Sequence, residues 1–175
     1  MSSSENIYLP YTAQITRIKQ ETPDVKTLSL RFTDEAVAKN FSYKPGQFVE
    51  FSVLGEGEST FCISNSPTRS GTSIECSIKQ MGKVTQAIHE LDIGDIVGIR
   101  GPYGNGFPIE NLKGKNLLFV AGGIGLAPLR SLINYCLDMR SDFKTLTIVN
   151  GARSSKDLVY KDEYENWKKQ KYTKK

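Results

Sequence analysis

The chain has 175 residues, of which 38% are hydrophobic and 24% are charged, and its formal net charge is +4. This composition is typical of a folded globular protein and excludes a largely disordered chain. Much of the positive charge lies in the last residues, "WKKQKYTKK", whose lysines we interpret as a solvated tail. A nucleic-acid groove would instead interleave aromatic residues with arginine across a folded surface, so we expect no nucleic-acid partner.

The cysteine and histidine content argues against a metal centre. Cys62, Cys76 and Cys136 lie far apart in the sequence, and His89 is the one histidine. We therefore expect no metal site, and reduced, packed thiols of the kind found in cytoplasmic proteins. Apolar runs stay shorter than the roughly 18 residues that a membrane span needs, and the N-terminus lacks the pattern of a secretion signal. We expect a cytoplasmic protein without a membrane span.

Residues 8–110 contain short segments in which apolar and polar residues alternate. The clearest examples are 25–32, 47–53 and 73–80. Alternation of this kind, interrupted by turns such as "KPGQ" and "TRSGT", predicts antiparallel strands. About six such strands at close spacing predict a small β-barrel, with one amphipathic helix at 83–91 among them.

Residues 114–175 follow a different pattern. We expect a strand at 116–121, a helix at 126–137, a strand at 145–149 and a helix at 159–170. The first strand is apolar without alternation, as is typical of a parallel strand covered on both faces. Pro128 fits the first turn of the first helix, where its missing N–H costs nothing. These elements predict the beginning of a doubly wound α/β nucleotide-binding domain.

The loop "AGGIGLAP" joins the first of these strands to the first helix. Its glycines, Gly122, Gly123 and Gly125, permit a tight turn and close approach of a ligand to the backbone. The helix that follows presents unpaired N–H groups and a partial positive charge, which suit a pyrophosphate. The spacing differs from the common G-x-G-x-x-G motif, so a plain turn between strand and helix is the alternative.

A second candidate anion site lies at the start of the 83–91 helix. Gly82, Lys83 and Thr85 place a lysine and a hydroxyl beside a helix N-terminus. The alternative is that Thr85 only caps the helix and Lys83 is only a surface charge. Upstream, "FCISNSP" combines an aromatic ring, a thiol and serines on a strand that leads to a proline.

Taken in order, the segments "FCISNSP", "GKVT", "GPYGNGFP", "AGGIGLAPLRSL" and "NGARSSKDLVYKDE" resemble the ferredoxin–NADP reductase superfamily. Within it, the sequence is most similar to the gamma (diaphorase) subunits of cytoplasmic NiFe hydrogenases and sulfhydrogenases. Relatives include the flavoprotein subunit of anaerobic sulfite reductase and the electron-transfer subunit of dihydroorotate dehydrogenase. The resemblance extends from residue 11 to about residue 167.

The resemblance implies a six-stranded antiparallel Greek-key barrel that binds FAD at 8–110, followed by an incomplete NAD(P)-binding α/β domain at 114–175. It also implies a flavoprotein subunit that moves electrons between NAD(P)H and a partner redox enzyme through FAD. The expected partner is an iron–sulfur or hydrogenase-type subunit. Because the flavin carries the chemistry, no catalytic acid or base is expected from the protein.

The resemblance also implies which residues contact each cofactor. For FAD they are Ser59, Thr60, Phe61, Cys62, Ile63, Ser64, Ser77, Ile78, Lys79, Gly82, Lys83, Val84 and Thr85. For the nicotinamide nucleotide they are Gly122, Gly123, Ile124, Gly125, Pro128, Gly151 and Arg153. Phe61 would pack against the flavin ring, the backbone of 62–64 would line its edge, and residues 82–85 would hold the FAD phosphates.

Three positions differ from the family's flavin motif, Arg-x-Tyr-Ser, and at one of them Phe61 stands in place of the tyrosine. Ser59 replaces the arginine, which removes a charge-assisted contact to the flavin phosphate of about 1.5–3 kcal/mol. Cys62 replaces the serine, and a thiol is a poorer hydrogen-bond donor than a hydroxyl. Nothing near Cys62 in the sequence favours a redox-active thiol. We interpret His89, on the helix after the flavin motif, as a surface or packed histidine.

The α/β part offers two strands, whereas doubly wound domains contain five or six. Family members continue with further strands, an aromatic lid over the nicotinamide and, in this branch, a cysteine cluster for a 2Fe–2S centre, whose ligands are absent here. We expect a shortened chain, with a second polypeptide that supplies the remainder as the alternative. Two other functions stay open: a non-catalytic FAD-binding or docking subunit, and an inactive remnant. The choice between NADH and NADPH also stays open.

Overall fold

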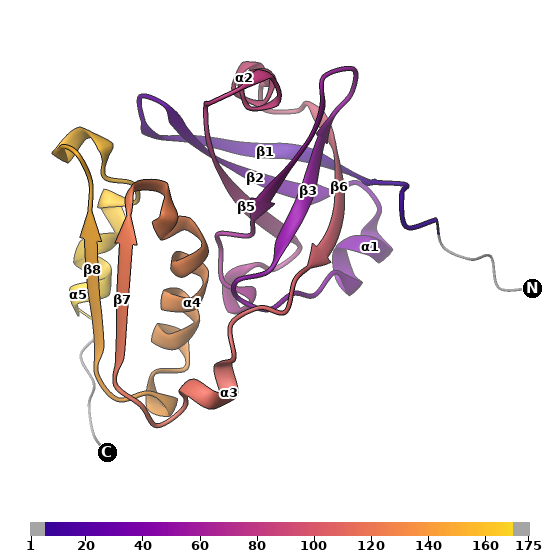
Figure 1. Cartoon of the computed structure of the whole chain (residues 1–175). Coiled ribbons are helices and arrows are strands. Elements are labelled where there is room, and N and C mark those ends of the chain that lie inside the picture. The colour runs from indigo at the N-terminus through magenta and orange to yellow at the C-terminus, as the bar shows by residue number, and fades with distance from the viewer. Residues whose placement is uncertain (1–5, 170–175) are drawn as a thin grey trace, which may run out of the picture.

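A six-stranded antiparallel barrel occupies the first part of the molecule in the computed structural model, which describes residues 6–169. Its strands are β1 (Tyr11–Thr22), β2 (Val25–Phe32), β3 (Phe48–Val53), β4 (Gly57–Cys62), β5 (Ser73–Lys79) and β6 (Ile96–Tyr103). They lie in the order β4-β3-β6-β1-β2-β5, and a bridge between Ile63 and Cys76 closes the barrel (Figure 1). The insertion of β6 between β3 and β1 is a Greek-key arrangement, which confirms the predicted barrel.

The alternating segments bury their apolar side chains in the barrel, as the sequence predicts. Leu28 and Leu30 on β2, Phe51 on β3 and Ile78 on β5 are fully buried. Helix α2 (Lys83–Glu90) lies at one end of the barrel and buries Ile88 in the same core. The predicted helix at 83–91 therefore forms, and it ends one residue earlier than expected.

A second helix interrupts the strands, although the sequence predicts only one. Helix α1 (Glu35–Asn40) lies between β2 and β3. The side chain of Asp34 accepts hydrogen bonds from the backbone N–H groups of Ala36 and Val37, at 2.7 and 3.2 Å. This N-cap stabilises a helix too short to show a periodic pattern in the sequence. The four-residue helix α3 (Ile109–Leu112) follows the barrel and leads into the α/β region.

The α/β region contains two parallel strands, β7 (Leu117–Gly122) and β8 (Leu146–Gly151). Helices α4 (Leu126–Asp138) and α5 (Tyr164–Lys169) complete it. Five 3₁₀ turns connect elements along the described chain: η1 (Pro67–Arg69), η2 (Gly123–Gly125), η3 (Arg140–Asp142), η4 (Ser155–Asp157) and η5 (Lys161–Glu163). Both strands point toward the end of the molecule that carries α2 and the β1–β2 turn (Figure 1).

One face of the β7–β8 sheet is covered and the other is exposed. Phe119 and Ile148 pack against the helices in an apolar core. On the opposite face, Leu118, Val120 and Val149 are 65%, 66% and 51% exposed. The apolar run of β7 is typical of a strand covered on both faces, but within the described residues only one face is covered, because α4 and α5 both contribute to the core on one side.

Helix α4 is buried on more than its apolar stripe. The apolar residues Leu126, Leu132 and Ile133 are buried, and so are the polar residues Ser131 and Asn134. The reason is that α4 lies between the β7–β8 sheet and the barrel (Figure 1). A helix that contacts structure on two sides must bury polar residues as well, and these require hydrogen-bond partners.

The predicted helix at 159–170 begins later than the sequence indicates. Val159 and Tyr160 are buried, and Tyr160 has a left-handed backbone conformation with φ 55°. A helix cannot pass through such a residue, so the chain turns at Tyr160 and continues through η5 into α5. Gln170, the last residue expected in this helix, lies outside the described residues.

Candidate functional site

The glycine loop connects β7 to α4 and is open to ligands. Gly123 adopts φ 53°, which favours glycine because it lacks a Cβ. At Gly122, Gly123 and Gly125, no other atom of the described residues lies within 4 Å of the place that a Cβ would occupy. Pro128 lies in the first turn of α4, as predicted. The loop thus leaves space in front of a helix N-terminus, where an anionic group is favoured.

A cavity of about 520 Å³ joins this loop to the barrel. Its lining comes from the β1–β2 turn, the end of β5, the glycine loop and the chain after β8. The residues are Thr22, Asp24, Val25, Lys79, Gly122, Gly123, Ile124, Gly151, Ala152, Arg153, Asp157 and Val159. The fold therefore brings Lys79, predicted to contact FAD, together with five residues predicted to contact the nicotinamide nucleotide.

Charged side chains of both signs line this cavity. Lys79 and Asp24 form an ion pair at 2.9 Å, and the hydroxyl of Thr22 donates to Asp24. The hydrogen bond from Lys79 holds the pKa of the Asp24 carboxyl below its usual range, with a smaller contribution from Thr22. Arg153 on the other side of the cavity is exposed. A phosphate that enters here would meet Arg153 directly and would compete with Asp24 for Lys79.

The start of α2 is a second open helix N-terminus. No other atom of residues 6–169 lies within 4 Å of the Cβ position at Gly82. The Thr85 hydroxyl accepts from the N–H groups of Met81 and Gly82 and donates to the Gly82 carbonyl. Lys83 is 74% exposed and pairs with Glu56 at 3.2 Å. A phosphate at this end would be held by free backbone N–H groups and by Lys83, since Thr85 already caps the helix.

The flavin motif lies at the end of β4. The ring of Phe61 meets Phe51 edge-on, with centroids 6.0 Å apart, and Phe61 stays half-buried. Thr60 donates to Glu50 on the neighbouring strand, and Ser59 is half-buried. Burial raises the pKa of the Cys62 thiol, which opposes thiolate formation and agrees with an inert cysteine.

The residues after β4 are turned into the interface between the barrel and α4. Ile63 is fully buried, and its N–H donates to the carbonyl of Gln47. The Ser64 hydroxyl is buried and donates to the Glu75 carbonyl at 3.1 Å. These side chains are engaged within the protein, so a ligand would reach this segment only through its backbone or through Cys62.

The β5 residues named from the resemblance are likewise mostly inward-facing. Ser77 shares hydrogen bonds with Thr27 and Ser64, and Ile78 is fully buried. The His89 ring lies 2.9 Å from the Ile78 carbonyl, which makes it a packed histidine. Val84 on α2 packs against the barrel core. Of these residues, Lys79 alone lines the shared cavity.

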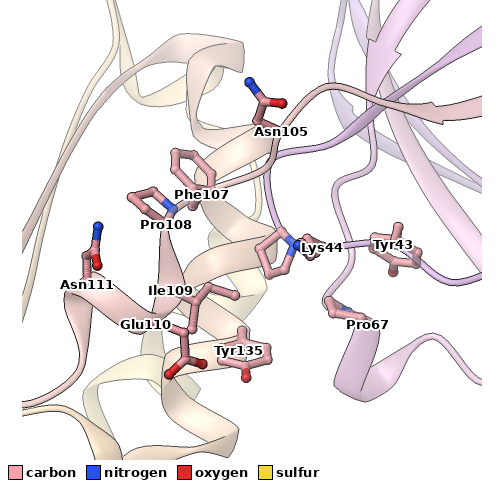
Figure 2. Close-up of a pocket in the computed structure, with 11 residues that line it drawn as sticks. Tyr43, Lys44, Pro67, Asn105, Phe107, Pro108, Ile109, Glu110, Asn111 and Tyr135 are labelled. Carbon is pink, nitrogen blue, oxygen red and sulfur yellow. The ribbon is translucent and has the colours of Figure 1, made fainter.

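A second cavity of about 510 Å³ lies toward the other end of α4, beside α3 (Figure 2). Tyr43, Lys44 and Pro67 line it from the barrel, and Phe107 and Tyr135 line it from the other side. The residues predicted to contact cofactors lie elsewhere, so this cavity is separate from the candidate site. The described residues also contain no helix long and apolar enough to cross a membrane, and no group of His, Cys, Asp or Glu arranged to hold a metal ion.

Comparison with known proteins identifies the family. Residues 12–107 match the oxidoreductase FAD-binding domain, and residues 119–175 match the oxidoreductase NAD-binding domain. The chain belongs to the FAD-binding oxidoreductase family. It is 42% identical to the Pyrococcus furiosus sulfhydrogenase 2 subunit gamma, over 90% of this chain and 54% of the relative. It is 39% identical to the sulfhydrogenase 1 subunit gamma of the same organism, over 96% of this chain and 57% of that relative.

A third relative of this FAD-binding oxidoreductase is a probable electron-transfer subunit of dihydroorotate dehydrogenase B from Methanocaldococcus jannaschii. It is 35% identical over 89% of this chain and 53% of the relative. The chain therefore spans about half the length of the curated relatives it matches. Among solved structures, the H286L mutant of Plasmodium falciparum ferredoxin–NADP⁺ reductase superposes with a TM-score of 0.80 at 20% identity. That match covers 95% of this chain and 68% of the reductase, and it shows the ferredoxin–NADP reductase fold.

Sequence reasoning missed the β1–β2 turn, which contributes Thr22, Asp24 and Val25 to the shared cavity. It also missed Asp157 and Val159, which line the cavity from the chain after β8. The turn carries no motif of its own, and it reaches the cavity only because β5 pairs with β2 and brings Lys79 beside it. No signal in a single sequence would have placed these residues in the site.

Proposed function

We propose that this chain forms the cofactor-holding part of an electron-transfer flavoprotein, with an FAD-binding barrel at 8–110 and an NAD(P)-binding region at 114–175. The observation that carries this proposal is the cavity of about 520 Å³ between the two regions. It joins Lys79 at the end of β5 to the glycine loop and to Arg153 after β8. Two dinucleotides that exchange electrons must meet at one place, and this cavity is where the two sets of predicted contacts converge.

The protein residues bind and orient the cofactors. Backbone N–H groups at Lys83 and Val84 would receive the FAD phosphates, and those of the glycine loop would receive the nucleotide pyrophosphate. The exposed part of Phe61 and the backbone beside Cys62 would bound the flavin. FAD itself supplies the redox chemistry when bound, because a flavin accepts hydride and passes on electrons. Three open glycine positions in the loop and the open Gly82 give both groups room.

We further propose that the electrons pass to a separate redox subunit that contains iron–sulfur centres, in the cytoplasm. Supporting this, the relatives named above are subunits of sulfhydrogenases and of dihydroorotate dehydrogenase B. The chain spans about half the length of each of these relatives. The identity of the partner and of the terminal electron acceptor is therefore part of this proposal.

A second candidate is a flavin-holding or docking subunit without nicotinamide turnover. Ser59 stands in place of the family's arginine, and both lysines near the candidate phosphate positions already pair with carboxylates. Lys79 pairs with Asp24 and Lys83 pairs with Glu56. A docking subunit would retain its fold and its partner contacts without reducing FAD.

Titration with FAD tests the flavin half of the proposal. We expect Lys83→Ala to weaken FAD binding at least about ten-fold, because one charge-assisted contact is worth about 1.5–3 kcal/mol. Lys144→Ala removes an exposed lysine before β8 and should leave FAD affinity unchanged. Affinity would be followed by quenching of flavin fluorescence. Equal affinities for both variants and the wild type would overturn the assigned phosphate position, and failure of the wild type to retain FAD would overturn the proposal.

A further inference from the structure

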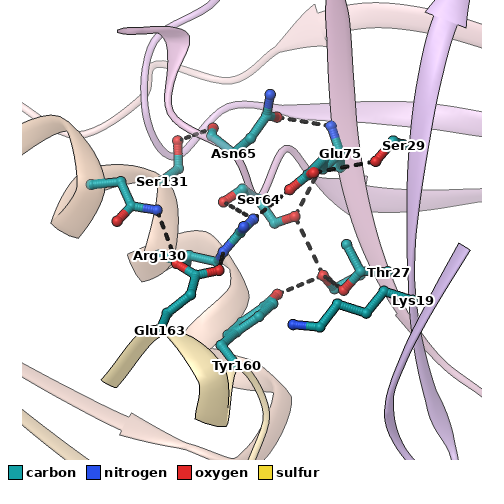
Figure 3. Close-up of polar contacts among 12 residues, drawn as sticks. Lys19, Thr27, Ser29, Ser64, Asn65, Glu75, Arg130, Ser131, Tyr160 and Glu163 are labelled. Atoms are coloured by element: carbon teal, nitrogen blue, oxygen red, sulfur yellow. Dashed lines mark hydrogen bonds and ion pairs between the residues drawn. The ribbon is translucent and has the colours of Figure 1, made fainter. Parts of the chain in front are cut away.

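Arg130 links three segments that lie far apart in the sequence. It is on α4, five residues after Gly125 of the glycine loop. Its Nε donates to Glu163 at 2.6 Å, and its Nη1 donates to Glu75 on β5 at 2.6 Å (Figure 3). The same Nη1 donates to the Ser64 carbonyl at 3.2 Å. One guanidinium therefore connects the helix behind the glycine loop to the barrel edge and to the turn before α5.

Tyr160 completes this arrangement. The Arg130 guanidinium lies 4.8 Å from the centroid of the Tyr160 ring. The Tyr160 hydroxyl donates to Ser77 at 2.5 Å, and its N–H donates to Glu21 at 3.0 Å. A bulky residue with positive φ is held in place only when its surroundings fix it from several sides. The contacts from β1, β5 and α4 do so here.

The three charged side chains, Arg130, Glu75 and Glu163, are largely buried. The side chains of Arg130, Glu75 and Glu163 are 14%, 21% and 17% exposed. Burial alone would lower the pKa of the Arg130 guanidinium, but Glu163 and Glu75 outweigh it and hold that pKa above its usual range. Arg130 thus stays charged, and its planar fork presents donors in fixed directions to two carboxylates, a geometry that the single flexible ammonium of a lysine does not reproduce.

Arg130 and Tyr160 also contact two buried residues of the candidate site, Ser64 and Ser77. Ser64 follows the flavin motif and Ser77 lies two residues before Lys79, so both belong to the barrel edge assigned to FAD. Ser131, next to Arg130, donates to the Asn65 carbonyl at 2.7 Å, which adds a second link from α4 to the same edge. The position of the glycine loop relative to this edge therefore depends on Arg130 and its partners.

We propose that Arg130 is a positioning residue, which fixes the glycine loop at a set distance from the FAD edge of the barrel. The expected effect on electron transfer rests on the proposed function. The role of Arg130 in holding the glycine loop rests on the contacts alone. Loss of the fork lets α4 shift, so the glycine loop samples positions in which the nicotinamide and the flavin are misaligned. Small misplacements of reacting groups slow transfer strongly, while flavin affinity, which depends on the barrel, changes little.

A second ion pair between the barrel and α4 provides a matched control. Arg69 on η1 pairs with Asp138 at the far end of α4 through three hydrogen bonds, at 3.0, 2.8 and 2.5 Å. These side chains are 39% and 25% exposed, and they contact residues outside the predicted cofactor set. Arg69→Lys therefore makes the same chemical change as Arg130→Lys in the same interface, away from the site.

The test begins with amide hydrogen exchange of the FAD-free chain. Exchange of the hydrogen-bonded amides 130–134 of α4, the helix that carries the glycine loop, should be at least ten-fold faster in Arg130→Lys and within two-fold of wild type in Arg69→Lys. Glu163→Gln removes the carboxylate that pairs with Arg130, so its exchange should resemble that of Arg130→Lys. This second variant keeps the test valid if Arg130→Lys fails to fold. Equal exchange in Arg130→Lys and Arg69→Lys would overturn the proposal.

The second readout is the rate of flavin bleaching by saturating NADH in the reconstituted chain. In Arg130→Lys this rate should fall about ten-fold while the Kd for FAD stays within two-fold of wild type. An unchanged rate beside faster exchange would overturn the positioning role. Absence of bleaching in the wild type would instead contradict the proposed nicotinamide activity, and the exchange result would still decide whether Arg130 fixes the loop.

Discussion

The barrel and the α/β region differ in how they cover their apolar surface. The barrel closes on itself through the Ile63–Cys76 bridge and buries its apolar side chains on the inside. The β7–β8 sheet has one covered face and one exposed face, with Leu118 and Val120 about two-thirds exposed. Six strands that enclose one core can be stable by themselves, whereas a two-stranded sheet does not stand alone.

This difference indicates that the α/β region depends on the barrel for its order. Its core includes Val25 from β2, and Tyr160 reaches Ser77 on β5. Helix α4 connects to the barrel through Arg130, Ser131 and Asp138. The glycine loop is therefore positioned mainly by contacts with the barrel. Substitutions in the two regions should have different consequences, which the following predictions address.

Removal of a barrel core side chain should have the largest effect. Phe51 is fully buried and packs against Phe61. Phe51→Ala should lower the free energy of unfolding by about 3–5 kcal/mol, because it removes buried apolar surface and leaves a cavity. Urea unfolding followed by circular dichroism measures this change. A loss below about 1 kcal/mol would contradict the barrel as the main source of stability.

Removal of a contact between the two regions should have an intermediate effect. Tyr160→Phe removes the hydrogen bond to Ser77 and should lower the free energy of unfolding by about 1 kcal/mol. Tyr8→Phe is a matched control, since Tyr8 is 76% exposed. If both variants unfold at the same urea concentration as the wild type, the α/β region does not draw stability from this contact.

Substitutions on the exposed sheet face should leave stability nearly unchanged. Leu118→Thr and Val120→Thr each alter a side chain about two-thirds exposed, so the free energy of unfolding should change by less than about 0.5 kcal/mol. Both should reduce self-association in light scattering, because exposed apolar surface promotes it. A clear loss of stability in either variant would mean that this face is covered in solution.

The Cys62 thiol offers a probe of the barrel edge that leaves the fold intact. Burial raises its pKa, so little thiolate exists at neutral pH and alkylation by iodoacetamide should be slow. The rate should increase as the pH approaches the raised pKa, and bound FAD should slow it further. Mass spectrometry of the alkylated peptide follows the reaction. Fast labelling at neutral pH would contradict the burial of the Cys62 thiol, and labelling unaffected by FAD would contradict the proposed placement of FAD beside it.

The sequence predicted the parts of the fold that have a regular local pattern. The alternation in 25–32 and 73–80 predicted β2 and β5, and the glycine loop was located because its turn chemistry lies in consecutive residues. Strand β1 was not placed individually, because bulges interrupt its pairing with β2 after Ile15 and after Gln20. Helix α1 was missed because six residues are too few to show a helical period.

The contacts that position the site lie between residues far apart in the chain. Arg130 and Glu75 are separated by 55 residues, and Tyr160 and Ser77 by 83. The hydrophobic pattern of α4 indicated only one buried face. It did not indicate that Arg130 and Ser131 face the barrel. Spatial neighbours of this kind follow from the packing of α4 between sheet and barrel, which no local pattern encodes.

The most direct test of the proposed function is an anaerobic visible spectrum of the chain reconstituted with FAD, recorded before and after addition of NADH or NADPH. We expect a bound flavin that bleaches with at least one nicotinamide nucleotide, because the glycine loop and the barrel edge meet at one cavity. Bound flavin that is reduced by dithionite alone would contradict nicotinamide turnover and favour the docking function. Failure to retain FAD would contradict the flavoprotein function itself.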